Sequence, residues 1–235
     1  MTAAVLFDVD GTLVDTPSGM TGVLRAVVAE AGRTVSDRTL QQTIGRPLAA
    51  SFSELFALPA DHRDVVRATE RARTLFTETV VPLAANLVFP GAREVLRDLR
   101  EREYRLAVVT SKIRSSADEL LSAAGLRHMF DTLSCHGMTA HGKPHPSLAL
   151  LASEAVGVPP ERCVVVGDGV DDMRMAVAAG MEPVGVATGV ASRAELLAVG
   201  GQVVLDHLGD LLTRLPANGG AGPVTHSRIL TSTQR

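Results

Sequence analysis

The chain has 235 residues, of which 46% are hydrophobic and 21% are charged, and its formal net charge is −3. This composition suits a globular protein with a sizeable core, and the slightly acidic balance gives no reason to expect nucleic-acid or membrane binding. The apolar runs are too short to span a bilayer and the N-terminus does not resemble a secretion signal, so we expect a cytoplasmic protein.

Five short apolar runs are predicted to be strands, because continuous apolar runs are typical of parallel strands that are buried on both faces. In chain order they cover residues 4–9, 105–110, 163–167, 183–187 and 202–206. Helical patterns follow several of these runs, and repeated strand–helix alternation predicts an α/β fold with a parallel sheet covered by helices.

The interval between the first two predicted strands is much longer than one crossover needs. Segments such as "GVLRAVVAEAG" and "DHRDVVRATERARTLFTET" within it read as helices with apolar residues three and four apart. We therefore predict an α/β core over residues 1–16 and 83–215 and an inserted helical domain over residues 17–82. The Gly- and Thr-rich residues 216–235 are predicted to be a disordered tail.

Polar side chains lie at the ends of three predicted strands and in one loop between them. These residues are Asp8, Asp10, Thr110, Ser111, Lys112, Lys143, Asp168 and Asp172. In an open parallel sheet, ligands bind beyond the carboxyl ends of the strands, so we expect this set to converge at one edge. Clustered carboxylates need a positive partner such as Mg²⁺, a lysine and a hydroxyl suit phosphoryl oxygens, and a carboxylate can itself form an aspartyl-phosphate.

Four motifs in this set carry a family resemblance. "DVDGT", "VVTS", the lysine of "GKP" and "GDGVDD" resemble, in order, the four motifs of the haloacid dehalogenase superfamily. The similarity covers residues 3 to about 212 and points to the phosphoglycolate phosphatase and beta-phosphoglucomutase-like group. It implies a Rossmann-like core in which the helical insertion is a cap domain.

The resemblance also implies roles for individual residues. Asp8 corresponds to the nucleophile, and Asp10 to the acid that protonates the leaving group and then activates water. Mg²⁺ would be held by Asp8, by the backbone carbonyl of Asp10 and by Asp168, with Asp172 orienting metal-bound water. Among the remaining motif residues, the family pattern assigns phosphate binding to Thr110 and Lys143 and a tight turn around the phosphate to Gly11.

Substrate contacts are predicted for Ser111, Lys112 and, from the cap segment "TIGRPL", Arg46. The alternatives are that Thr110 and Ser111 only cap a helix, that Asp172 only charges a helix N-terminus, and that Arg46 and Lys112 are surface residues. No role is assigned to Asp15 or His145. Five histidines without ligand spacing are expected on the surface: His62, His128, His136, His141 and His207.

Asp10 favours phosphomonoester chemistry, because an alkoxide leaving group needs a proton and a halide does not. The predicted function is a Mg²⁺-dependent phosphoric monoester hydrolase that acts on phosphoglycolate, a sugar phosphate or a nucleotide through an aspartyl-phosphate. Alternatives are a phosphosugar mutase, a pyrophosphatase and a non-catalytic binding protein on this fold. The expected partner is a small phosphorylated metabolite rather than nucleic acid or membrane, and the expected state is a monomer or homodimer.

Overall fold

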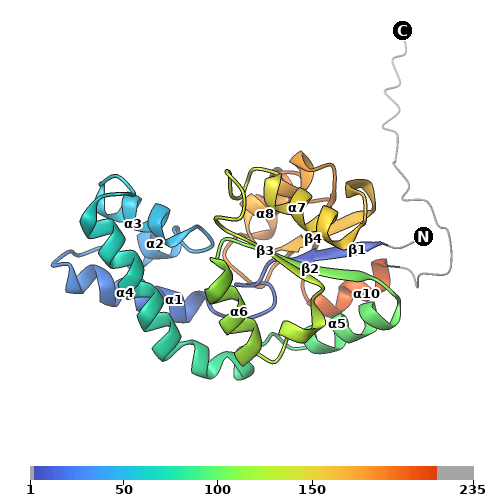
Figure 1. The fold of residues 1–235 in the computed structure, drawn as a ribbon, viewed down its shortest axis with the longest axis horizontal. Coiled ribbons are helices and arrows are strands. Elements are labelled where there is room, and N and C mark those ends of the chain that lie inside the picture. Colours follow the sequence, from blue (N-terminus) through green and yellow to red (C-terminus); the bar gives the residue numbers. More distant parts are fainter. Residues whose placement is uncertain (1–2, 216–235) are drawn as a thin grey trace, which may run out of the picture.

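The computed structural model describes residues 3–215, so the predicted tail over residues 216–235 lies outside it (Figure 1). Its centre is a sheet of six parallel strands in the order β3-β2-β1-β4-β5-β6. The strands are β1 (Ala4–Phe7), β2 (Arg105–Thr110), β3 (Thr132–Cys135), β4 (Cys163–Gly167), β5 (Glu182–Val186) and β6 (Val203–Leu205). The predicted α/β fold with a parallel sheet is confirmed.

The order of the strands places a topological switch point between β1 and β4. The chain runs outward from β1 to β3 on one side and from β4 to β6 on the other. Phe7, the last residue of β1, is level with Val108 of β2 and Val166 of β4. The residues that follow these three strands therefore meet at one edge, where ligands bind in sheets of this kind.

Strand β3 was not among the predicted strands. It has four residues, "TLSC", at the outer edge of the sheet and pairs only with β2. Two of its residues carry hydroxyls, and the stretch has no apolar run for a pattern search to find. Its pairing with β2 decides its conformation, so the local sequence gives little indication of it.

Helices cover both faces of the sheet (Figure 1). The side chains of Val5 and Phe7 pack into a cluster with α5 and α6, and Leu6 packs on the opposite face with α7 and α8, because successive strand residues point to opposite faces. The core helices are α5 (Ala92–Glu101), α6 (Arg114–Ala123), α7 (Ser147–Val156), α8 (Val170–Ala178), α9 (Arg193–Ala198) and α10 (Leu211–Arg214).

Four further helices form a unit beside the sheet, at the left of Figure 1. They are α1 (Pro17–Glu30), α2 (Asp37–Gln41), α3 (Leu48–Phe56) and α4 (Arg63–Thr79). Phe52, Phe56, Val65 and Phe76 are buried in this unit, and they belong to the same apolar cluster as Val5 and Phe7 on one face of the sheet. No helix in the described part of the chain is long and apolar enough to cross a bilayer.

The two chain segments that join this helical unit to the sheet lie side by side. Val14 bridges to Val88, the backbone N–H of Asp15 donates to the carbonyl of Leu87 at 2.7 Å, and that of Phe89 donates to Leu13 at 3.0 Å. Entry to the helical unit and exit from it are therefore held together by backbone hydrogen bonds.

Candidate active site

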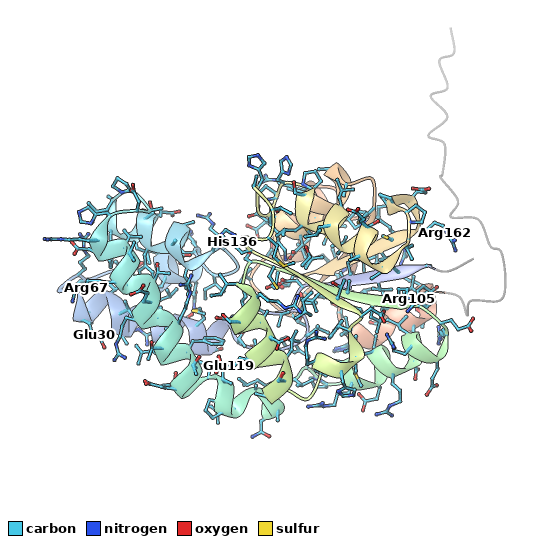
Figure 2. All side chains as sticks on the ribbon, in the orientation of Figure 1. Glu30, Arg67, Arg105, Glu119, His136 and Arg162 are labelled. Carbon is cyan, nitrogen blue, oxygen red and sulfur yellow. The ribbon has the colours of Figure 1, made fainter. Side chains whose placement is uncertain are left out.

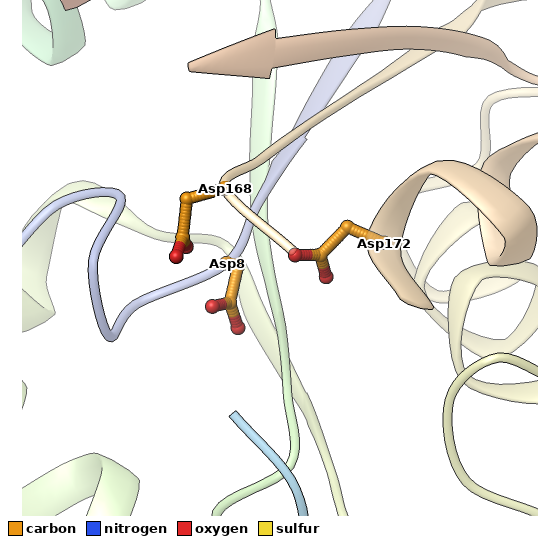
Figure 3. Close-up of side chains that lie close together, drawn as sticks. All are labelled: Asp8, Asp168 and Asp172. Atoms are coloured by element: carbon orange, nitrogen blue, oxygen red, sulfur yellow. The ribbon is translucent and has the colours of Figure 1, made fainter. Parts of the chain in front are cut away.

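Three carboxylates meet just beyond the carboxyl ends of β1 and β4 (Figure 3). Asp8 directly follows β1, and its N–H donates to the carbonyl of Val166 at 2.9 Å. Asp168 directly follows β4, and Asp172 lies in the first turn of α8. One oxygen from each carboxylate lies within 4.8 Å of the other two, and all three residues are buried.

Lys143 pairs with two of these carboxylates. Its Nζ lies 2.7 Å from Oδ1 of Asp8 and 2.5 Å from Oδ1 of Asp172. Burial acts to lower the pKa of Lys143, but the negative charges of Asp172 and Asp8 outweigh it and hold that pKa above its ordinary value. The amine therefore stays charged at physiological pH, and Asp8 faces a fixed positive charge.

Two of these carboxylates, those of Asp8 and Asp168, have a pKa above the ordinary value for aspartate. Burial raises the pKa of Asp8 well above its ordinary value, although the charge of Lys143 opposes this. Burial and the neighbouring Asp172 raise the pKa of Asp168 to about 7. With every carboxylate ionised, the cluster would hold three negative charges against the single positive charge of Lys143.

Asp168 is fixed from both sides. One oxygen accepts a 2.8 Å hydrogen bond from Oγ1 of Thr12, and the other accepts a 3.0 Å hydrogen bond from the N–H of Val190. A Cβ atom added at Gly11 or Gly189 would collide with this carboxylate, so both positions need glycine for the backbone to come this close. Gly11 also has a φ of +81°, which glycine adopts without strain.

Asp10 has partners separate from those of Asp8. The hydroxyl of Thr16 donates a hydrogen bond to Oδ1 of Asp10, and the Nζ of Lys112 lies 3.2 Å from the same oxygen. Asp8 and Asp10 both line one cleft, between the sheet edge and the helical unit. The two acids of the opening motif thus reach the same space, and each has a lysine of its own. These two lysines are the only ones in the sequence.

The contacts of Thr110 and Asp172 bear on their predicted alternative roles at helix N-termini. Thr110 is buried and its hydroxyl accepts from the N–H of Lys112 at 3.2 Å, whereas the residue that precedes helix α6 is Ile113. A helix-capping role for Thr110 is therefore wrong. Asp172 does accept a hydrogen bond from the N–H of Gly169 at the start of α8, at 3.0 Å, in addition to its contact with Lys143.

Ser111 and Arg46 also line the cleft, but Arg46 has a counter-charge nearby. Its Nη1 lies 2.5 Å from Oε2 of Glu54, and both side chains are about half exposed. Lys112 is only 11% exposed, and its Nζ lies 4.0 Å from the centre of the Phe76 ring in helix α4. The prediction that Lys112 could be a plain surface residue is wrong, and a substrate contact for Arg46 stays a prediction.

The expectation of surface histidines is wrong for His136. This residue follows β3, lines the cleft and has a ring Nδ1 that is buried. The backbone N–H of His136 donates to the carbonyls of Thr110 and Lys112, which holds the residue against the end of β2 and the turn that follows. The reason for the error is that His136 directly follows the strand that was not predicted, so its place at the sheet edge could not be inferred.

Three threonines at this edge, Thr12, Thr16 and Thr188, are not among the predicted site residues. Thr12 is the last residue of the motif "DVDGT", in which roles were predicted only for the acids and the glycine, and Thr16 lies four residues after it. Thr188 donates to the carbonyl of Gly11 at 2.7 Å and comes directly after a predicted strand. The rule that strand ends form the site would have found Thr188 if it had been applied to the fifth strand in the sheet.

The residues of the carboxylate cluster fit a hard divalent cation. Carboxylate oxygens are the ligands that Mg²⁺ prefers, and a charge of +2 would balance the excess of two negative charges left after pairing with Lys143. Glycine at positions 11 and 189 keeps the backbone close to Asp168 and leaves no side chain in the way.

Comparison with known proteins adds independent information. The model of the haloacid dehalogenase-like hydrolase family matches residues 2–180. The chain is 40% identical over 213 residues to "Probable phosphatase IndB" of Dickeya dadantii, which covers 90% of this chain and 93% of that protein. It is 33% identical over 229 residues to a phosphoglycolate phosphatase of Rhodospirillum rubrum, with 94% of each chain covered.

The fold agrees with this similarity. A haloacid dehalogenase-like hydrolase from Bacteroides fragilis superimposes with a TM-score of 0.81 at 27% identity, over 90% of this chain and all of that one. The family model covers well over half of the sequence, and all four motifs lie within the matched residues. This protein belongs to the haloacid dehalogenase-like hydrolase family.

Proposed function

We propose that the protein is a Mg²⁺-dependent phosphatase that hydrolyses a small phosphomonoester through an aspartyl-phosphate on Asp8. The observation that carries the proposal is the pairing of two neighbouring acids with different partners: Asp8 with Lys143 at 2.7 Å, and Asp10 with Lys112 at 3.2 Å. The phosphatase names of the relatives from Dickeya dadantii and Rhodospirillum rubrum support the same reaction class.

In the first step, an oxygen of Asp8 forms a bond to phosphorus while the bond from phosphorus to the substrate oxygen breaks. Asp10 donates a proton to that leaving oxygen, so the alcohol departs neutral. In the second step, Asp10 takes a proton from a water molecule whose oxygen attacks phosphorus. The bond to Asp8 breaks, and inorganic phosphate and a free Asp8 carboxylate result.

Lys143 and Thr110 would assist both steps from fixed positions. Lys143 keeps its charge because of Asp172 and Asp8, and can neutralise a phosphoryl oxygen as well as Asp8. Thr110 is buried at the end of β2, where its hydroxyl can donate to another phosphoryl oxygen. Bound Mg²⁺ would supply further charge neutralisation, with Asp8, Asp168 and the backbone carbonyl of Asp10 as the groups that hold it and Asp172 acting through a water molecule.

The helical unit would act as a cap over residues 17–82, with the core formed by residues 1–16 and 83–215. The cleft between the unit and the sheet edge supports this role, because Asp10 and Thr110 line one side, and Arg46 and Phe76 line the other. A cap of this kind limits the leaving group to a small molecule and keeps bulk water away from the phosphoryl group.

The function is tested by measuring phosphate release from p-nitrophenyl phosphate and from a panel of phosphorylated metabolites. We expect turnover with Mg²⁺ and loss of turnover with excess chelator, restored when Mg²⁺ is added back. Failure to hydrolyse any phosphomonoester would overturn the proposal. Isomerisation of a sugar phosphate in the presence of a bisphosphate primer, without net phosphate release, would assign a mutase instead.

A second prediction concerns metal and pH. An unfolded aspartate has a pKa near 4, whereas that of folded Asp168 is about 7, so the folded state binds more protons between these values. Metal-free protein should therefore lose stability as the pH rises from about 4 through about 7. Because Mg²⁺ binds the ionised carboxylate, we expect it to raise the thermal midpoint more at pH 8 than at pH 6.

Thermal unfolding with and without Mg²⁺ at the two pH values measures this effect. Asp168→Asn should lose most of the Mg²⁺-dependent increase, whereas Asp171→Asn, one residue before Asp172 and outside the carboxylate cluster, should keep it. An equal increase in the Asp168→Asn variant would show that Mg²⁺ binds elsewhere.

A further inference from the structure

One cation in the cleft, Arg73, has no counter-charge in the described part of the chain. Arg46, Arg73 and Lys112 all line it, but Arg46 is paired with Glu54 and Lys112 with Asp10. Within residues 3–215, no acid or carbonyl pairs with the guanidinium of Arg73. An arginine that is partly buried in a cleft without a counter-charge is available to an anion that enters the cleft.

Helix α4 directs Arg73 toward the catalytic edge. Arg73 and Phe76 are three residues apart and so lie on the same face of the helix. Phe76 is buried, and its ring lies under the Nζ of Lys112 at 4.0 Å. The face of α4 that carries Arg73 is therefore in contact with the turn after β2, from which Thr110 and Lys112 reach the reacting group.

His136 lies on the core side of the same cleft, where the core faces the helical unit (Figure 2). The backbone N–H of His136 donates to the carbonyls of Thr110 and Lys112, at 3.1 and 2.9 Å, so the residue is held beside the turn after β2. The ring Nδ1 is buried and has no hydrogen-bond partner in the described structure. Arg73 and His136 both line this cleft. Burial and then the positive charge of Arg73 lower the pKa of His136.

We infer that Arg73 and His136 form an anion subsite that recognises a carboxylate or second phosphate on the leaving group of the substrate. This inference rests on the proposed phosphatase function and narrows its substrate class to phosphomonoesters with a second negative charge. Arg73 can donate two parallel hydrogen bonds to such a group. When the anion binds, its negative charge favours the protonated form of His136, and the imidazolium can donate a further hydrogen bond to it.

Two substrate pairs separate the possible sources of the charge. 2-Phosphoglycolate and 2-hydroxyethyl phosphate differ by a carboxylate, and fructose 1,6-bisphosphate and fructose 1-phosphate differ by a phosphate. We expect wild-type protein to prefer the charged member of at least one pair by roughly 10- to 100-fold in kcat/KM, the range of a charge-assisted hydrogen bond. The pair that shows the preference identifies the anion.

Arg73→Gln should remove this preference by raising KM for the charged substrate roughly 10- to 100-fold, with little change for the uncharged one. His136→Gln should reduce the same preference less. Arg67→Gln, on an exposed position of the same helix, serves as the matched control and should keep the wild-type ratio. Absence of a preference in both pairs, or an equal loss for both members in Arg73→Gln, would overturn the inference while the phosphatase function stands.

A binding experiment decides the inference without turnover. The ring signal of His136 is followed by NMR while malonate and then inorganic phosphate are added to the full chain. We expect either anion to shift the signal toward that of protonated histidine in wild-type protein and in Arg67→Gln, and to leave it unchanged in Arg73→Gln. No response to either anion in the wild type would overturn the subsite even if no phosphomonoester is hydrolysed.

Discussion

Replacement of Asp8 with asparagine is expected to reduce phosphate release by roughly 10⁴-fold or more, because an amide oxygen does not form the phosphoryl–enzyme bond. The side chain is nearly isosteric, so the contact with Lys143 can persist as a neutral–charged hydrogen bond. Steady-state phosphate release measures the loss. Mass spectrometry of acid-quenched enzyme should show a phosphorylated wild type and an unmodified variant.

The matched control for this substitution is Asp15→Asn, in the same loop. Asp15 is exposed, does not line the cleft and lies outside the carboxylate cluster. It should retain wild-type turnover. Turnover of Asp8→Asn within tenfold of the wild type, in protein that shows the wild-type unfolding temperature, would assign the nucleophile to another group.

Lys143→Met should affect both stability and activity. Removing the amine leaves Asp8 and Asp172 buried side by side without a positive partner, which costs about 3–5 kcal/mol when such a pair is broken. The pKa of Asp8 should rise further, so less of the ionised nucleophile is present at neutral pH. We expect turnover to fall by at least about 10²-fold, the effect of losing one group that stabilises transition-state charge.

The stability loss in Lys143→Met should depend on pH in a definite direction. At pH 8 the unfolded variant has ionised Asp8 and Asp172, whereas the folded variant must either bury both charges without a partner or keep the carboxyls protonated, and both cost free energy. At pH 5 keeping them protonated costs less. Urea unfolding of metal-free protein should therefore show a larger deficit at pH 8 than at pH 5. A deficit that is equal at the two pH values would indicate lost packing rather than lost charge.

A double variant distinguishes charge from packing in the same experiment. Lys143→Met with Asp172→Asn removes one of the two like charges, so it should recover part of the stability that Lys143→Met loses. It should not recover activity.

The lysine side chains can also be followed by NMR. In ¹³C-lysine-labelled protein the lysine signals come from Lys112 and Lys143 alone, because the sequence has no other lysine.

The sheet and the gathering of acids at its edge could be predicted because their signals are local in the sequence. Each central strand is a continuous apolar run, and each acid or hydroxyl of the edge follows such a run directly. The residues that were missed lack this property. Arg73 lies in the middle of a polar helix, and His136 follows a four-residue edge strand, so both reach the cleft only through packing between segments far apart in the chain.

The contacts of individual residues show the same limit. That Asp8 and Asp10 share one space follows from their spacing, but that each pairs with a different lysine depends on loops 100 or more residues away. The ion pair between Arg46 and Glu54 depends on how the turn before α3 folds back on that helix. Charge pairing of this kind is set by tertiary structure, and no periodicity in the sequence encodes it.

The paired connections at Val14 and Val88 have a consequence for how the chain folds. The pairing of β1 with β2 joins residue 4 to residue 105, so the chain between them must close a long loop. If the helical unit forms first and brings residues 14 and 88 together, the remaining loop is only about a quarter as long. Two halvings of loop length lower the entropic cost of closure by roughly 1.2 kcal/mol. Phe52→Ala, inside the helical unit, should therefore slow refolding of the sheet, and an unchanged rate would show that the sheet forms independently.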